Sequence, residues 1–201
     1  MPKIVDHDRY RKELLRGCLD LFAERGYGSI TMRQIAKGLG VSTGTLYHYF
    51  PSKESIFMQL VQELCEQDIS NFFAQAPEAP TLEGRLQAIV DFVFKNTQYY
   101  SQQLVLWVDF FQQTHTDSDH DINFLRQVWE RARATLADYL QISDPALVDF
   151  VMIFLDGLIL QCIYGRVYDH VAPDTAWFHQ QSQLMIQMII HYEQNFPQLQ
   201  T

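Results

Sequence analysis

Apolar residues recur every three to four positions along almost the whole chain, with polar residues between them. This spacing places the apolar side chains on one face of an α-helix. The pattern therefore predicts an all-α protein of about nine helices, separated by prolines, glycines and short polar stretches. We expect helices over residues 8–26, 31–39, 42–50, 52–76, 81–99, 102–113, 119–140, 144–168 and 173–196.

Residues 30–52 contain two short predicted helices joined by a glycine turn, which is the pattern of a helix-turn-helix. Thr31 and Gln34 have the spacing of a capping box at the start of the first helix. Gly40 ends that helix in the left-handed region, and Val41 is placed to fill the angle between the helices. Ser42 caps the second helix, which Pro51 stops. The apolar face of the first helix consists of Met32, Ile35, Ala36 and Leu39.

The second of these helices has a polar face suited to reading DNA. A rotation of ~100° per residue places Leu46 and Phe50 on the buried side. Short polar groups on the opposite side allow close approach to base edges, and phenols on the two flanks can reach phosphates on both walls of a groove. The polar face contains Gly44, Thr45 and His48, and the flanks carry Tyr47 and Tyr49.

Lys53 follows Ser52, which caps the next helix. A cation in the first turn of a helix is unfavourable against the positive end of the helix dipole. A bound phosphate reverses that penalty, so Lys53 is expected to contact the DNA backbone.

The runs LFAERGYGSITMRQIA and GVSTGTLYHYFPSKESIF resemble the DNA-binding domain of the tetracycline-repressor (TetR) family of bacterial regulators. The resemblance covers about Leu19 to Leu60 and is only architectural beyond it. It implies base contacts by Thr43, Gly44, Thr45 and His48. It also implies phosphate contacts by Thr31, Ser42, Tyr47, Tyr49 and Lys53.

Two alternatives stand beside this interpretation. A helix-turn-helix can serve packing alone, but the many polar residues on one face of residues 42–50 disfavour that role. Near the start of the first predicted helix, Arg9, Arg11, Lys12 and Arg16 either contact phosphates or form a solvated face.

Charge is divided unevenly along the 201 residues, whose net charge is −9. Residues 1–56 hold nine Lys and Arg against six Asp and Glu, whereas residues 57–201 hold six against eighteen. A basic head on an acidic body directs the head to DNA. We therefore expect a DNA-binding domain over residues 1–56 and an effector-binding and dimerisation domain over residues 57–201.

The composition favours a soluble, cytoplasmic protein with a packed core, since 47% of the residues are hydrophobic. Cys18, Cys65 and Cys162 are far apart and lie in apolar helical stretches, as reduced thiols do. The polar N-terminus has no secretory signal pattern. The longest apolar stretch, residues 150–163, contains Asp156 and Gln161 and is too short to span a bilayer, so no membrane partner is expected.

The last two predicted helices are apolar on more than one face. One face of each is left over after packing on the body, and a second copy of the chain is the simplest partner for it. We expect a homodimer through a four-helix bundle. Gly157 and Gly165 are costly inside a helix, and close approach of a facing helix would explain them.

Aromatic residues are frequent in the body and stand at different phases of their helices, as in the walls of a cavity. Three carboxylates lie within apolar runs, where they either face a pocket or are paired structurally with Tyr, Gln or Arg. The predicted effector pocket contains Asp91, Phe92, Trp107, Asp109, Phe110, Trp129, Phe154, Asp156 and Trp177. The body has few basic residues, so a planar apolar or cationic effector is expected.

The segment His115 to Asp121 is the only metal-like cluster in the sequence. Asp117, Asp119 and Asp121 mimic the start of a calcium loop, but Ile122 and Val128 replace its glycine and glutamate. A solvated loop between helices is favoured over a metal site. Catalytic motifs are missing as well, so we expect no enzyme, metal or cofactor.

The sequence thus predicts a homodimeric regulator that binds a near-palindromic duplex and is released by a small molecule. Repression is what the family resemblance implies. Two rivals remain: a DNA-binding regulator controlled by a protein partner, and a metal-dependent enzyme that uses the His115 segment.

Overall fold

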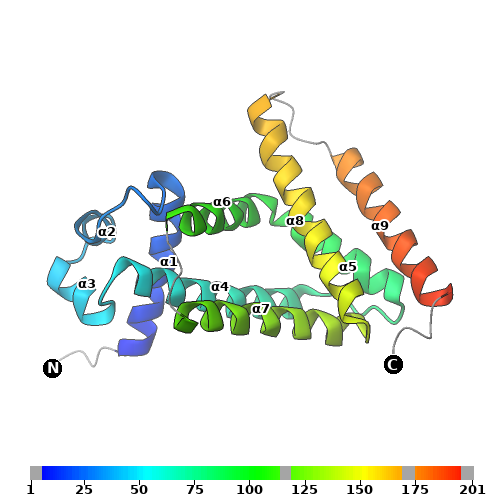
Figure 1. The fold of residues 1–201 in the computed structure, drawn as a ribbon, viewed down its shortest axis with the longest axis horizontal. Helices are drawn as coiled ribbons and strands as arrows, with labels where there is room; N and C mark the ends of the chain where they lie inside the picture. Colours follow the sequence, from blue (N-terminus) through cyan, green and yellow to red (C-terminus); the bar gives the residue numbers. More distant parts are fainter. Residues whose placement is uncertain (1–5, 114–118, 169–174, 196–201) are drawn as a thin grey trace. The chain divides into compact units, whose positions relative to one another are not determined.

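A computed structural model describes residues 6–113, 119–168 and 175–195, with the backbone alone for residues 119–122 and 166–168. Within these residues the chain forms nine α-helices and no strand, which confirms the predicted all-α fold (Figure 1). The helices are α1 His7–Arg25, α2 Met32–Gly38, α3 Thr43–Tyr49, α4 Lys53–Gln75, α5 Leu82–Lys95, α6 Thr97–Gln113, α7 Asp119–Leu140, α8 Pro145–Tyr168 and α9 Thr175–Asn195.

The chain divides into two compact units. The first unit consists of Met1–Asp68 and Val105–Val128, and the second consists of Ile69–Leu104 and Trp129–Thr201. The boundary predicted between residues 56 and 57 lies inside α4, within the first unit. The functional division at that position stays a prediction.

The first unit has a core of apolar side chains from α1 to α4 and from the second half of α6. The faces predicted for the helix-turn-helix are the faces that pack, since Ile35 and Ala36 of α2 and Leu46 of α3 are buried. Cys18 is also part of this core, and burial raises the pKa of its thiol to about 12, so it stays protonated and unreactive.

The second unit has its own core, formed mainly by α5, α8 and α9 with the end of α7. Helix α8 alone contributes Leu147, Val148, Val151, Leu155, Leu158, Ile159 and Cys162. Helices α8 and α9 pack on each other, as do α5 and α9. The segment Pro145–Gly165 of α8 is long and apolar enough to cross a membrane, with a mean hydropathy of 2.1. The expectation that the longest apolar stretch is too short to span a bilayer is therefore wrong. Seven residues of this segment belong to the core of the second unit, and 39% of the segment is buried.

The helix boundary between α5 and α6 lies at Asn96, so the predicted break between residues 99 and 102 is wrong. The Asn96 amide donates to the Phe92 carbonyl at 2.8 Å, and the Thr97 hydroxyl donates to the Phe94 carbonyl at 2.6 Å. The Thr97 hydroxyl satisfies a carbonyl at the end of α5, and the Asn96 side chain adds a second donor to the Phe92 carbonyl, which also accepts from the Asn96 N–H at 3.2 Å. The spacing of the apolar residues does not reveal these side-chain hydrogen bonds, so it could not predict the helix boundary.

Candidate nucleic-acid interface

Helix α3 separates a buried side from an exposed side in the way that the sequence predicts. Leu46 and the C-cap residue Phe50 are fully buried. Thr43, Gly44 and His48 are exposed. Tyr47 is 51% exposed on one flank, and Tyr49 is half-buried on the other. The structure therefore brings most of the predicted DNA-contacting residues together on one free face.

The turn between α2 and α3 holds that face at a fixed angle. Gly40 has a φ of 69°, as predicted, in the left-handed region that favours glycine. The Val41 N–H donates to the Ala36 carbonyl at 3.0 Å, and the Gly40 N–H donates to the Lys37 carbonyl at 3.2 Å. These two bonds form a Schellman motif, which closes the end of α2.

The predicted helix caps are present, and some of the capping side chains are also predicted phosphate contacts. Thr31 and Gln34 form the capping box of α2. The Thr45 N–H donates to the Ser42 hydroxyl at 2.9 Å, which caps α3. The Ser42 and Thr45 hydroxyls are also 2.8 Å apart, and Thr45 is half-buried. Thr45 is therefore less available to a base than Gly44 or His48.

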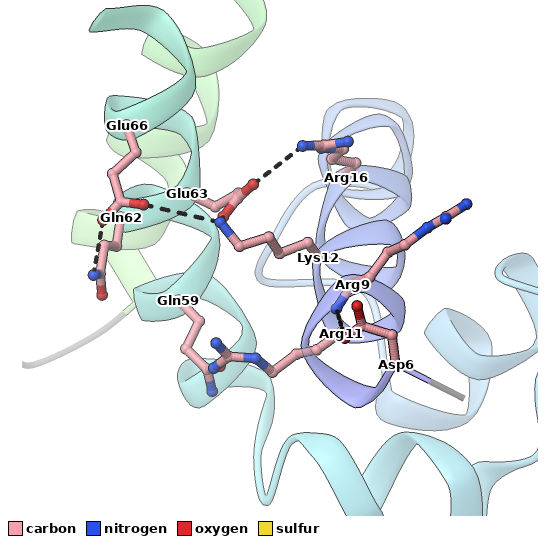
Figure 2. Close-up of polar contacts among 9 residues, drawn as sticks. All are labelled: Asp6, Arg9, Arg11, Lys12, Arg16, Gln59, Gln62, Glu63 and Glu66. Carbon is pink, nitrogen blue, oxygen red and sulfur yellow. Dashed lines mark hydrogen bonds and ion pairs between the residues drawn. The ribbon is translucent and has the colours of Figure 1, made fainter. Parts of the chain in front are cut away.

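The basic residues near the start of α1 are paired mainly with α4 (Figure 2). Glu63 of α4 is buried and lies 2.8 Å from the Lys12 ammonium and 3.3 Å from the Arg16 guanidinium. Arg11 donates to the Gln59 side chain at 2.7 Å. A buried carboxylate needs such partners, since an unpaired one is costly. These cations therefore fix α1 against α4. The sequence analysis considered only a phosphate contact or a solvated face for them and did not predict this role.

Arg9 has a partner within α1 itself. It pairs with Glu13 one turn further along α1 at 3.0 Å, and both side chains are largely exposed. A phosphate contact and a solvated face both need an exposed Arg9, so the two predicted alternatives stay open.

Lys53 turns its ammonium toward the protein itself. The ammonium donates to the Tyr27 carbonyl at 2.6 Å and lies 4.4 Å from the centre of the Tyr27 ring. Burial lowers the pKa of Lys53, and the Asp109 carboxylate partly opposes that shift. Lys53 therefore has a structural role in the protein, which the helix-dipole argument did not predict. Its phosphate contact stays a prediction.

Asp109 and Phe110 of α6 complete this corner of the first unit. The Gly28 N–H donates to the Asp109 carboxylate at 3.2 Å. Phe110 is fully buried and stacks on Phe57 with 3.6 Å between the ring centres. Burial is the main cause that raises the pKa of Tyr27, which packs on both rings, to about 12. Asp109 thus has a structural partner, but this partner is a backbone N–H and not the Tyr, Gln or Arg side chain that the sequence analysis considered.

The predicted pocket residues are divided between the two units. Trp107, Asp109 and Phe110 belong to the first unit, and the other six belong to the second. Within the second unit Asp91 accepts a hydrogen bond from Gln87, Trp177, Phe92 and Phe154 are half-buried, and Trp129 and Asp156 are exposed.

Two hollows in the second unit have volumes of about 310 and 280 Å³, and neither is lined by a predicted pocket residue. The larger lies between the end of α7 and the start of α8, and the smaller between the start of α8 and the end of α9. The predicted pocket stays a prediction.

The metal-like segment falls largely outside the described part of the chain. His115 and Asp117 are not among the described residues, and Asp119, His120 and Asp121 are described by their backbone alone. Among the side chains that are described, no group of three or more His, Cys, Asp or Glu could hold a metal ion.

The exposed face of α3 and its fixed angle are the features of a DNA-reading helix, and comparisons with known proteins agree with them. Residues 14–60 match the family model of the bacterial regulatory proteins of the tetR family. The chain belongs to the TetR family of transcriptional regulators. The match includes the whole of α2 and α3 and the start of α4.

Relatives of this TetR-family chain carry the same kind of name. It is 28% identical over 131 residues to the HTH-type transcriptional regulator BetI of Brucella melitensis biotype 2, which is 65% of each chain. It is 26% identical over 167 residues to BetI of Rhizobium meliloti (strain 1021), covering 80% of this chain and 81% of that protein. The match thus spans just under two thirds of the Brucella relative's length.

Solved structures share the fold at low sequence identity. Bacillus subtilis FadR in complex with stearoyl-CoA superposes with a TM-score of 0.70 at 16% identity, covering 90% of this chain and 97% of that chain. A putative transcriptional regulator from Saccharomonospora viridis in complex with choline has a TM-score of 0.66 at 18% identity, with 94% and 98% covered.

Two residues that the sequence did not point to are part of this region. His7, the first residue of α1, lies 2.8 Å from the Tyr49 hydroxyl through its Nδ1 atom. Glu63 is the buried partner of Lys12 and Arg16. Each lies more than 40 positions from its partner along the chain, so no local pattern could show the pairing.

Proposed function

We propose that this TetR-family chain is a cytoplasmic, homodimeric repressor that binds a near-palindromic operator through α3 and is released by a small-molecule effector. The exposed face of α3, with Thr43, Gly44 and His48 outward and Leu46 fully buried beneath, is the observation that carries the DNA-binding part. Gly44 adds no side chain, so the helix can approach the base edges closely. The name of the BetI relatives, HTH-type transcriptional regulator, supports the same role.

The base-reading role of His48 is tested on duplexes selected from a random pool by the purified protein. His48→Ala should change the preferred base at one position in each half-site, at a cost of about 1–3 kcal/mol on the wild-type duplex. Asn71→Ala, an exposed change in α4, is the matched control. An unaltered base preference in the His48 variant would contradict the assignment.

The homodimer is proposed from an exposed apolar face on α8 and α9 of the second unit. Ile153 is 66% exposed and Met188 54% exposed, with Phe150 and Leu184 also exposed. Nothing within 4 Å would meet a Cβ added at Gly157, so there is open space in front of it. Exposed apolar area of this kind is typical of a surface that pairs with another chain. A twofold axis across it would form the four-helix bundle.

The effector part of the proposal rests on charge. Residues 57–201 carry a net charge of −12, which attracts a cation and repels an anion. Aromatic side chains such as Phe92, Trp129 and Trp177 offer faces for stacking and cation–π contacts. A neighbour of the same fold binds choline, a cation, although FadR of Bacillus subtilis binds stearoyl-CoA.

A thermal-shift screen of matched cationic, neutral and anionic aromatic compounds tests this effector class, followed by measurement of operator release. Cationic or neutral compounds should stabilise the protein and lower its affinity for the duplex. If only carboxylates or phosphates do so, the charge argument fails. Release by a purified protein partner alone would favour the rival in which no small molecule acts.

A further inference from the structure

Helix α1 contacts the DNA-reading helix through a hydrogen bond and several aromatic rings. His7 Nδ1 lies 2.8 Å from the Tyr49 hydroxyl oxygen. The ring of Tyr49 also lies 5.0 Å from the ring of His48 and 5.5 Å from that of Tyr10. The rings of His7 and His48 are 6.3 Å apart. One end of α1 thus contacts the flank of α3 that is expected to meet phosphate.

The direction of this bond decides what the Tyr49 hydroxyl can do. A hydroxyl has one proton to donate, whereas a phosphate oxygen only accepts. If Tyr49 donates to His7, its oxygen can offer a phosphate nothing but lone pairs. If His7 donates through Nδ1–H, the Tyr49 proton is free for the phosphate. The same 2.8 Å contact is therefore either an obstacle to DNA binding or a support for it.

We propose that His7 is a positioning residue for DNA binding: it donates Nδ1–H to Tyr49, so that the Tyr49 hydroxyl donates to a phosphate of the operator. The inference rests on the proposed function and adds a residue to it. Both the imidazolium and the neutral Nδ1–H tautomer supply the donor. No bond to DNA by His7 itself is needed.

Tyr47 provides an internal comparison. It lies on α3 two residues before Tyr49 and is 51% exposed. Among the described residues it has no ring or hydrogen-bond partner. Its hydroxyl can reach a phosphate without help, so loss of His7 should not change its contribution. Tyr47→Phe is therefore the matched control for Tyr49→Phe.

The experiment measures the affinity of full-length variants for a duplex selected by the wild-type protein, at one fixed salt concentration. The set contains His7→Ala, Tyr49→Phe, Tyr47→Phe and both combinations with His7→Ala. Two further variants separate positioning from bulk. His7→Asn places an amide donor near the position of Nδ1, and His7→Gln places it near the position of Nε2. His7 is exposed, so these variants should fold, and thermal denaturation checks that they do.

His7→Ala and Tyr49→Phe should each weaken binding about 2- to 12-fold, the ratio typical of one net hydrogen bond. Their combination should be no weaker than Tyr49→Phe alone, whereas His7→Ala and Tyr47→Phe should add. His7→Asn should restore binding to within about twofold, and His7→Gln should not.

The inference is overturned if His7→Ala changes nothing, if it weakens the Tyr49→Phe protein as much as the wild type, or if Asn does no better than Gln. Failure of the wild-type protein to select or bind any duplex overturns the proposed function instead, and this inference with it.

Discussion

At the scale of single residues, Lys53 was predicted to contact a phosphate, but its ammonium contacts Tyr27 in the structure. Helix-dipole reasoning predicts a phosphate contact, but the ammonium donates to the Tyr27 carbonyl at 2.6 Å and lies over the Tyr27 ring. A charge-assisted hydrogen bond contributes about 1.5–3 kcal/mol. The contact to Tyr27 therefore holds the turn between α1 and α2 close to the start of α4.

Lys53→Met should lower the free energy of unfolding by about 1–3 kcal/mol, because it removes the charged donor and keeps the aliphatic chain. Lys37→Met, an exposed lysine at the end of α2, should change it by less than about 0.5 kcal/mol. Urea denaturation measures both. Equal stability of the two variants would contradict the structural role of Lys53. An unchanged salt dependence of DNA binding in Lys53→Met would contradict the predicted phosphate contact.

Tyr27 links the stability of the first unit to alkaline pH. The folded protein raises the pKa of its phenol from 10.0 to about 12, mainly by burial. The protonated form is thus favoured in the fold, so the stabilisation is present below pH 10 and is lost as pH rises from 10 to 12. The loss reaches up to about 2.5 kcal/mol for this residue.

Tyr27→Phe cannot ionise and should lose less stability than the wild type between pH 10 and 12. Tyr47→Phe, whose ring is half exposed, should follow the wild type. Unfolding in urea at several pH values measures the difference, and parallel curves for wild type and Tyr27→Phe would disprove the burial argument.

The sequence predicts which side of a helix is buried, but it does not predict the partners of individual side chains. The buried and exposed sides of α3 follow from its 3.6-residue period, so Leu46, Phe50, Gly44 and His48 could be assigned without coordinates. The partners of Tyr49, Lys53 and Asp109 could not, because His7, Tyr27 and Gly28 reach them through the tertiary fold.

At the scale of helices, the contact of α1 with α4 depends on Glu63. This buried carboxylate accepts from both Lys12 and Arg16 (Figure 2), and its loss leaves two cations of α1 without their shared partner. Because α1 also contacts α2, and α2 contacts α3, the orientation of the reading helix depends on how α1 is held.

Glu63→Gln should destabilise the protein by about 1–3 kcal/mol, since it removes two ion pairs from a buried site. Glu66→Gln is the control, because its carboxylate is 4.0 Å from Lys12 and partly exposed, and it should cost less than about 1 kcal/mol. Thermal denaturation compares the two variants. A Glu63→Gln protein as stable as Glu66→Gln would show that the pairs contribute no net stability.

The helices were predictable where caps and breakers are strong. Asp119–Leu140 matches its predicted bounds, and the caps Thr31, Ser42 and Ser52 act as expected. The break at Asn96 was missed because its cause is a pair of side-chain hydrogen bonds to carbonyls, which leave the apolar period of α5 and α6 unbroken.

At the scale of the whole molecule, the apolar face of α8 and α9 predicts how the chain assembles. Met188→Glu would place a carboxylate in the interface twice, by symmetry, at a cost of several kcal/mol. The variant should be monomeric by light scattering and should lose operator binding with the dimer. Val108→Glu, on a half-exposed valine of α6, should stay dimeric. A Met188→Glu dimer would move the interface away from this face.

The measurement that tests the central claim most directly is selection of DNA by the purified wild-type protein from a random duplex pool, followed by the stoichiometry of the complex. We predict one enriched sequence with two inverted half-sites, bound by a dimer, with the half-site centres roughly 34–36 Å apart or a multiple of that distance. A double variant, Gly44→Glu with His48→Ala, should enrich nothing, since the carboxylate blocks close approach of α3. An unenriched pool with the wild type, or the same sequence enriched by both proteins, would contradict the claim that the exposed face of α3 reads DNA.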